Sequence, residues 1–247
     1  MGLQCKSSGS SRKVNGFLKI MLTFLDFDGV IVDSIEECYL VSKKAYFGYA
    51  NFPFPEFEYK DLFYKYRGLV RPPYEYMFLH KAIELHMQNK NHKVRKLFGK
   101  MISKGPDKDS MFFEKEFFYI RDLFKSDNFD NWVSINPLTK FGKTLVGNQN
   151  PNVNIITTKN RDATESLLDY YNIPVSAIYA NDEIKKIGSK GKVIKLILDK
   201  KKENSAIFVD DATEHLETVS DSRIQCFFAD WGYGENTKFP IYNWRKI

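Results

Sequence analysis

The chain has 247 residues, with 43% hydrophobic and 28% charged side chains, which is the composition of an ordinary globular protein. It contains no uninterrupted apolar stretch near the roughly 20 residues that a membrane helix needs, so we expect no membrane association. Its three cysteines are widely spaced, which argues against a disulfide framework or a structural zinc site and makes a cytoplasmic setting the default. The net charge of +6 suits an anionic substrate and would also fit weak nucleic-acid affinity.

Residues 1–20 differ from the rest, because they contain lysine, arginine and several serines but no acidic residue. We interpret this stretch as a leader that is either disordered or an artificial extension. The alternative is an organellar targeting segment, since transit peptides are basic, rich in serine and poor in acids. Met21 stands directly before the first expected strand, where the folded part of the chain is expected to begin.

Two carboxylates one residue apart close the first expected strand, which covers residues 22–27. Because alternate residues of a strand point to the same side, Asp26 and Asp28 are expected to face one site. Two such carboxylates repel each other unless a cation or a shared proton relieves the repulsion. The pair therefore predicts a metal site or acid–base chemistry.

The segment from residue 35 to 140 is expected to be mainly helical. Ser34 and Glu37 have the spacing of a capping box, which opens a helix through about Gly48. Residues 50–75 are rich in proline and aromatic residues, which predicts breaks in regular structure. Helical patterns then follow over residues 74–90, 92–104, 109–125 and 137–147.

Beyond residue 150, short apolar runs alternate with helical patterns. Strands are expected over residues 153–157, 177–179, 206–209 and 224–229, and helices over residues 162–171, 190–200 and 213–220. Such alternation indicates the α/β class, with a parallel sheet covered by helices on both faces. We expect one α/β core domain, built from residues 21–34 and 141–247, with a mainly helical domain of residues 35–140 inserted into it.

More polar residues gather at the carboxyl edge of this expected sheet, where the ligands of open α/β sheets bind. The residues at these strand ends, and before the helix at 190–200, are Thr157, Thr158, Lys190, Asp210 and Asp211. Acids at two strand ends can hold Mg²⁺, which prefers oxygen ligands and often bridges to phosphate. Asp26 can then attack phosphorus, while Asp28 protonates the leaving oxygen and afterwards activates water.

Taken in order, four pieces of the chain resemble the motifs of the haloacid dehalogenase superfamily. They are residues 26–30, residues 155–157, Lys190 and residues 209–211. Residues 26–34 are similar to members whose cap domain follows the first strand, and residues 228–234 are similar to phosphoglycolate-phosphatase-like members. The resemblance implies a Rossmann-like, three-layer parallel-sheet core with an inserted helical cap, although the insertion itself matches the family only by its position.

The resemblance implies a role for each matching acid. Asp26 is expected to be the nucleophile and a Mg²⁺ ligand. Asp28 is expected to be the general acid and base, with its backbone carbonyl on the metal. Asp211 matches the direct metal ligand and Asp210 its helper, although these two roles could be exchanged.

The phosphate-binding residues follow from the same resemblance. Thr157 matches the phosphate-binding hydroxyl, with its neighbour Thr158 as the alternative in register. Lys190 resembles the lysine that clamps the phosphate, because it opens a helix, and Lys192 is the alternative.

These residues together predict a Mg²⁺-dependent phosphatase that hydrolyses a small phosphorylated metabolite through an aspartyl-phosphate. Asp28 favours phosphoryl transfer, since dehalogenases of the superfamily typically lack this second aspartate. A phosphomutase similar to β-phosphoglucomutase uses the same core residues, and a phosphatase acting on a nucleotide or polynucleotide terminus is a further alternative. The complete set of acids argues against a non-catalytic binding protein.

Overall fold

The computed structural model describes residues 21–48, 52–148, 152–236 and 238–246. The leader interpreted from residues 1–20 lies outside these described residues. Within the described ranges, none of the helices combines the length and the apolar character needed to cross a membrane.

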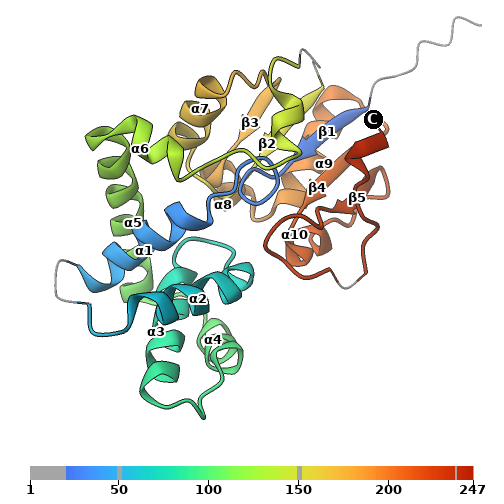
Figure 1. Cartoon of the computed structure of the whole chain (residues 1–247). Helices are drawn as coiled ribbons and strands as arrows, with labels where there is room; N and C mark the ends of the chain where they lie inside the picture. Colours follow the sequence, from blue (N-terminus) through green and yellow to red (C-terminus); the bar gives the residue numbers. More distant parts are fainter. Residues whose placement is uncertain (1–20, 49–51, 149–151, 237, 247) are drawn as a thin grey trace, which may run out of the picture.

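A five-stranded sheet forms the centre of the molecule (Figure 1). Its strands are β1 (Leu22–Leu25), β2 (Val153–Ile156), β3 (Ala177–Tyr179), β4 (Ala206–Asp210) and β5 (Ile224–Phe228). All neighbours pair in parallel, in the order β3-β2-β1-β4-β5. Since β1 lies between β2 and β4, the end of the first strand is flanked by the ends of both strands that carry polar residues.

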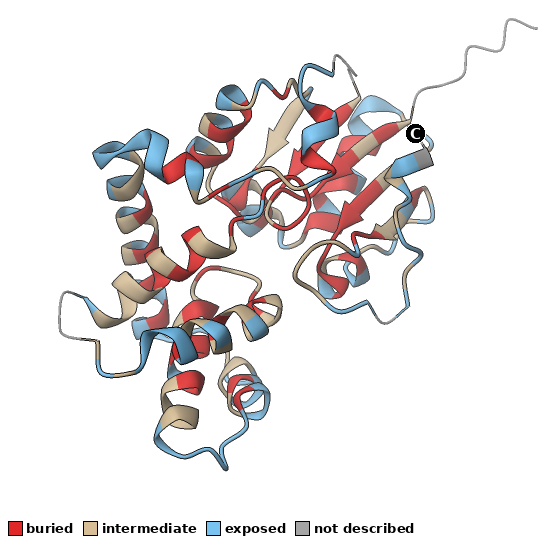
Figure 2. Cartoon of the chain, viewed as in Figure 1, coloured by how far each residue is buried: buried red, intermediate tan, exposed pale blue. Residues whose placement is uncertain are grey.

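Helices cover both faces of the sheet. Alternate residues of the strands enter two separate apolar clusters, with Leu25 and Val209 in one, and Phe24 and Phe208 in the other. The first cluster is covered by α7 (Arg161–Tyr170), and the second by α8 (Asn181–Ile187), α9 (Lys190–Lys201) and α10 (Thr213–Glu217). Figure 2 shows β1, β2 and β4 largely buried between these layers, whereas the edge strand β3 is of intermediate burial. The expected α/β class with a three-layer core is confirmed.

Helices dominate the stretch between β1 and β2. They are α1 (Ile35–Phe47), α2 (Glu56–Tyr66), α3 (Glu75–Gln88), α4 (Val94–Ile102), α5 (Lys108–Asp127) and α6 (Phe129–Ser134), with short 3-10 turns at η1 (Arg67–Leu69) and η2 (Gly142–Leu145). Helices α1 to α5 pack on their own aromatic core, which includes Tyr59, Phe63 and Phe117. We call this helical unit the cap; Figure 1 shows α2, α3 and α4 standing apart from the sheet. The proposed domain limits at residues 34/35 and 140/141 remain a prediction.

His80 lies at the centre of this cap core. Its ring nitrogens lie 2.8 Å from the Tyr59 hydroxyl and 2.8 Å from Ser42 Oγ. Burial lowers the pKa of His80 to about 3, so the ring is neutral at physiological pH. It therefore joins α1, α2 and α3 as a hydrogen-bonded core residue.

Three local expectations were wrong. Residues 56–66 form α2, because Pro55 precedes the helix, where a missing N–H costs nothing. No helix covers residues 137–147; only η2 forms there, and Gly142 packs so closely on the Ile31 carbonyl that a side chain would not fit. Ser34 makes no side-chain cap bond. Its hydroxyl lies 3.8 Å from Cys38 Sγ, and Glu37, the other member of the expected capping box, forms buried ion pairs.

Candidate active site

The residues predicted from the strand ends lie together at the carboxyl edge of the sheet. Asp26 follows β1, Thr157 follows β2, and Asp210 and Asp211 close β4. All four are buried, with at most 6% of their surface exposed. A cavity with a free volume of about 30 Å³ lies among them, lined from the core by Asp26, Asp28, Thr157, Thr158, Asp211 and His215.

Lys190, the first residue of α9, also reaches this edge of the sheet. Its ammonium lies 2.8 Å from Asp26 Oδ1 and 2.8 Å from Asp210 Oδ2, and the residue is 1% exposed. Lys192 is exposed, and its backbone N–H donates to Ser189 Oγ, the cap of the same helix. The geometry therefore favours Lys190 over Lys192 as the lysine of the site.

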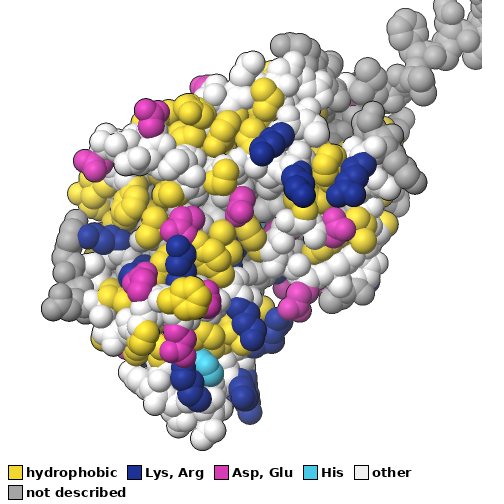
Figure 3. Space-filling model, in the orientation of Figure 1, with side chains coloured by type: hydrophobic (Ala, Val, Ile, Leu, Met, Phe, Trp, Pro, Cys, Tyr) yellow, Lys and Arg dark blue, Asp and Glu magenta, His cyan; other side chains and the backbone are white. Residues whose placement is uncertain are grey.

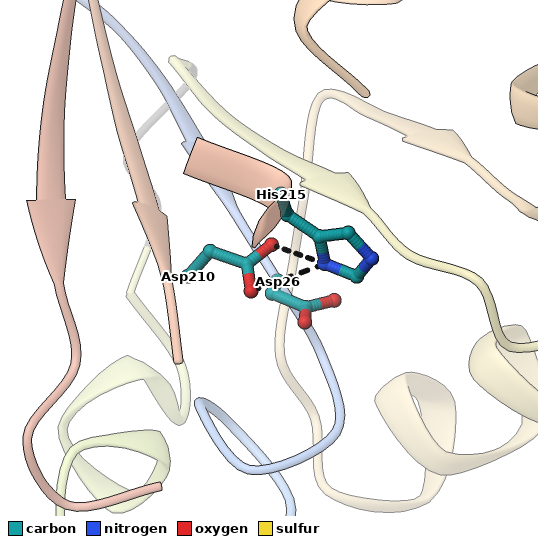
Figure 4. Close-up of side chains that lie close together, drawn as sticks. All are labelled: Asp26, Asp210 and His215. Carbon is teal, nitrogen blue, oxygen red and sulfur yellow. Dashed lines mark hydrogen bonds and ion pairs between the residues drawn. The ribbon is translucent and has the colours of Figure 1, made fainter. Parts of the chain in front are cut away.

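Both carboxylate oxygens of Asp210 have hydrogen-bond or ion-pair partners. Oδ1 accepts from the Ala212 N–H at 2.8 Å, Oδ2 faces Lys190, and His215 Nδ1 lies 3.1 Å from Oδ2 (Figure 4). Although burial alone would raise the pKa of Asp210, the positive charge of Lys190 and the contact with His215 lower it. These contacts favour Asp210 as the residue that holds Lys190 rather than as a direct metal ligand.

The backbone of neighbouring residues closely surrounds the Asp211 carboxylate. Side chains at Gly29 or Gly232 would overlap its carboxylate, and Gly29 also has a φ of +82°, which glycine adopts most easily. The Tyr233 N–H donates to Asp211 Oδ2 at 2.6 Å. Burial and the neighbouring charge of Asp210 raise the pKa of Asp211 to about 6.

Asp26 and Asp28 have opposite electrostatic surroundings. Burial, followed by the charge of Asp210, raises the pKa of Asp26 well above its usual value, and Lys190 offsets this only in part. For Asp28, the effect of burial is outweighed by Lys159, whose ammonium lies 3.1 Å from Oδ1, and by Arg121, so that its pKa is lowered. The pKa values of the two carboxylates are therefore shifted in opposite directions, which suits two different roles.

Arginines from the cap close the cavity from the other side. Arg67 and Arg71 line it together with Val70 and Tyr233. Arg67 is 8% exposed, its guanidinium stands over the rings of Tyr76 and Tyr233, and its Nε is buried without a hydrogen-bond partner. Sequence reasoning missed both arginines, since only the folded cap brings them to the strand ends.

The acidic side chains of the site suit a divalent cation, but a lysine already contacts some of them. Asp26, Asp210 and His215 offer atoms within 4.8 Å of one another, yet the Lys190 ammonium already contacts the first two. Lys190 contacts Oδ1 of Asp26, and Asp26 and Asp211 are the carboxylates that remain for a metal. Burial and the charge of Asp210 raise the pKa of both, and Asp211 also raises that of Asp26. A hard cation that prefers oxygen would favour the ionised form of both.

No protein-family model matches the chain, and no curated protein matches it either. Several solved structures do match the chain. A predicted phosphoglycolate phosphatase from Haemophilus somnus aligns with a TM-score of 0.58 at 15% identity, over 93% of each chain. A haloacid dehalogenase-like hydrolase from Streptococcus pneumoniae aligns with a TM-score of 0.51 at 16% identity, over 92% of this chain and 96% of the other.

A predicted phosphatase from Clostridium acetobutylicum aligns similarly, with a TM-score of 0.55 at 14% identity, over 91% of this chain and 94% of the other. Because these alignments span about nine tenths of the chain, they include the helical insertion as well as the sheet. The resemblance inferred from the motifs is thus confirmed for the fold.

Proposed function

We propose that this chain, which has the haloacid dehalogenase-like fold, is a Mg²⁺-dependent phosphatase that hydrolyses the phosphomonoester of a small metabolite. The observation that carries the proposal is the meeting of Asp26, Asp28, Thr157 and Asp211 around one cavity, with Lys190 against Asp26. These groups come from separate parts of the chain. The names of the similar structures, phosphatases and hydrolases, support the same reading.

The metal would be held by the carboxylates of Asp26 and Asp211 and by the backbone carbonyl of Asp28. Bound there, Mg²⁺ offsets the repulsion between a carboxylate nucleophile and a phosphate dianion. Thr157 Oγ1 accepts from the Lys159 N–H, which leaves its own O–H free to donate to a phosphate oxygen. Lys190 supplies a second, positively charged donor beside the nucleophile.

Asp26 and Asp28 then carry out the two displacement steps of the reaction. Asp26 attacks phosphorus while the bond between phosphorus and the ester oxygen breaks, and Asp28 gives its proton to that oxygen, so that the alcohol leaves. Asp28, now ionised, takes a proton from water as the water oxygen attacks the aspartyl-phosphate. Inorganic phosphate leaves and the Asp26 carboxylate is restored.

The substrate is proposed to be a small ester that carries a further negative charge. Among the described residues, Arg67 has no carboxylate partner, although it is buried beside the cavity. An anionic group on the substrate would satisfy it. Phosphoglycolate, the substrate in the names of the similar structures, has this character and is the first ester to test.

The narrow cavity favours a phosphomutase as the second candidate. A volume of about 30 Å³ holds little more than a water molecule, so the cap must move away to admit any ester. A cap that closes this tightly could equally retain a phosphorylated sugar and exclude water. Release of inorganic phosphate, as opposed to transfer to a sugar phosphate, distinguishes the two functions.

A nucleic-acid terminus is a weaker candidate. On the face shown in Figure 3, lysine and arginine side chains alternate with aspartate and glutamate and form no continuous positive surface. Several ion pairs, such as Arg95 with Glu235, join the cap to the core. A polynucleotide would require an open, positively charged channel.

The test is hydrolysis of a panel of phosphorylated metabolites, headed by phosphoglycolate, with release of inorganic phosphate as the readout. We expect activity that EDTA abolishes and Mg²⁺ restores, and that Asp26→Asn eliminates without loss of the folded circular dichroism spectrum. Full activity of Asp26→Asn would overturn the mechanism. Activity that persists in EDTA would overturn the metal requirement.

A further inference from the structure

His215 lines the catalytic cavity but has no role in the two proposed displacement steps. It lies on α10, and its side chain is 17% exposed. Nδ1 of its ring lies 3.1 Å from Asp210 Oδ2 and 3.3 Å from Asp210 Oδ1, and Figure 4 shows the opposite edge of the ring turned away from Asp210. One ring nitrogen is therefore paired at the sheet edge, and the role of the second, Nε2, has to be found elsewhere.

The contact with Asp210 determines which ring nitrogen of His215 carries the proton. The pKa of Asp210 is lowered, so its carboxylate is ionised and can only accept hydrogen bonds. Burial, followed by the charge of Lys190, lowers the pKa of His215, so that the ring is neutral at physiological pH. Nδ1 then holds the single ring proton and donates it to Asp210, while Nε2 keeps an unshared electron pair.

Two neighbouring side chains at the cavity each have one atom that accepts no hydrogen bond. Among the described residues, every hydrogen bond of the His215 ring involves Nδ1. Asp26 Oδ1 accepts from the Phe27 N–H at 2.7 Å and contacts Lys190, whereas Asp26 Oδ2 accepts no hydrogen bond within the same part of the chain. His215, Asp26 and Asp210 offer atoms within 4.8 Å of one another. A nitrogen and a carboxylate oxygen are thus available from adjacent side chains.

The pairing of His215 with Asp210 is typical of a histidine that binds a metal. Ligand histidines usually donate their other ring N–H to a carboxylate, which fixes both the tautomer and the orientation of the ring. Asp210 has this place relative to His215 and also holds Lys190, so it supports two side chains of the site rather than binding a cation itself. If His215 served only to support Asp210, Nε2 would have no use.

We propose that His215 Nε2 is a further ligand of the cation that Asp26 and Asp211 bind, and that this nitrogen makes the site favour a transition-metal cation such as Mn²⁺ over Mg²⁺. The inference rests on the metal requirement of the proposed function and extends it to the identity of the ion. Imidazole nitrogen suits first-row transition metals, whereas Mg²⁺ prefers oxygen ligands alone. Either divalent cation can offset the negative charge of a phosphate ester.

The experiment titrates the metal-free protein with Mn²⁺ and with Mg²⁺ by calorimetry. We expect the Kd for Mn²⁺ to be at least about tenfold lower than the Kd for Mg²⁺. His215→Asn keeps a side-chain N–H for Asp210 but removes Nε2, and it is expected to raise the Kd for Mn²⁺ about tenfold and the Kd for Mg²⁺ less than about threefold. His92→Asn is the matched control and should change neither Kd, because His92 is exposed on the cap and does not line the cavity.

Electron spin echo spectroscopy of bound Mn²⁺ gives a second readout, because it detects a nitrogen bonded directly to the ion. We expect a nitrogen signal in the wild type and in His92→Asn, and none in His215→Asn; His215→Gln takes its place if that variant does not fold. Bound Mn²⁺ without a nitrogen signal, or an equal rise of both Kd values in His215→Asn, overturns the inference and leaves the phosphatase proposal standing. If the protein binds neither ion, the metal requirement of the proposed function falls, and the inference with it.

Discussion

Asp26 and Asp28 stand two residues apart, yet their environments move their acidities in opposite directions. Asp26 is buried beside Asp210, which raises its pKa, whereas Asp28 faces Lys159 and Arg121, which lower its pKa. In Asp26 the raised pKa marks a carboxylate that needs a cation before it can react. In Asp28 the lowered pKa favours the ionised form while the site is empty. The negative charge of a bound phosphate ester would raise this pKa, so that Asp28 holds a proton for the first displacement and takes one from water in the second.

Lys190 is the residue whose removal should affect stability and activity together. Lys190→Met leaves Asp26 and Asp210 buried without their shared cation, which is expected to cost about 3–5 kcal/mol of unfolding free energy and to eliminate turnover. Lys192→Met, at an exposed position of the same helix, should change neither. Urea unfolding and phosphate release measure the two effects. A loss at Lys192 rather than Lys190 would reverse the assignment.

Metal affinity should depend on pH through Asp211. Its pKa of about 6 in the absence of metal means that a proton competes with Mg²⁺ below pH 6, while the carboxylate is already ionised above it. We expect the Kd for Mg²⁺ to rise at least about tenfold per pH unit below 6 and to level off above 7, as measured by calorimetry. Asp211→Asn should weaken binding at every pH. A Kd that is the same at about pH 5 and pH 7 would contradict this account.

The site residues that follow strands could be predicted from the sequence. The residues that only the folded cap brings to the site could not. An apolar run followed by Asp26 and Asp28 fixes both the strand and the side on which the acids emerge, and the same holds for Asp210 and Asp211. Lys159 lies two residues beyond the strand predicted over residues 153–157 and carried no distinguishing signal in the sequence. Glu37 fitted a capping box, and only the fold shows that its partner is Arg121.

At the scale of the elements, short helices and turns were the least predictable. Helix α2 was hidden by prolines and aromatics that favour irregular structure locally, although Pro55 is well placed for a helix start. The expected helix over residues 137–147 does not form: Leu138 pairs with Val32 in an antiparallel bridge, and Gly142 lies close against the backbone of Ile31. Long segments with a sustained period, such as α3 and α5, were predicted within a few residues of their bounds.

The turn η1 brings the cap against the core at Gly68. A side chain there would overlap the Tyr233 carbonyl oxygen, and the N–H of Tyr233 holds Asp211. Gly68→Ala is therefore expected to lower kcat/KM about tenfold or more by displacing η1 and Tyr233, with little change in Tm. Steady-state kinetics and a melting curve test this expectation.

Gly99→Ala is the matched control, because Gly99 lies within α4 with open space around it. Alanine there should keep full activity and add up to about 1 kcal/mol of stability. Equal kinetics for Gly68→Ala and the wild type would show that the cap seats without this close contact.

At the scale of the whole molecule, the cap and the core have distinct hydrophobic clusters, which meet at Phe124 of α5. Their connections include ion pairs at the edges, among them Lys185–Glu114 and Arg71–Glu214. One side chain of each of these two pairs is well exposed, and such pairs are weak and are screened by salt. The buried pair of Lys159 with Glu37 also joins the two units, but buried pairs add little net stability. The two units are therefore expected to separate more easily than either unfolds.

Hydrogen exchange should reveal this division. Leu79→Ala, in the cap core, is expected to cost about 2–5 kcal/mol and to remove protection from α1 to α4 while the strands keep theirs. Leu198→Ala, equally buried under the sheet, should have the opposite pattern. Uniform loss of protection in either variant would indicate a single cooperative unit.

The central claim is that Asp26 carries the phosphoryl group during turnover. Acid quenching during the first turnovers, followed by mass spectrometry of the peptides, tests it most directly. The account predicts one added phosphoryl group on the peptide that contains Asp26, dependent on Mg²⁺ and absent in Asp26→Asn. Steady release of phosphate without any phosphorylated peptide, or with the group on another residue, would contradict it.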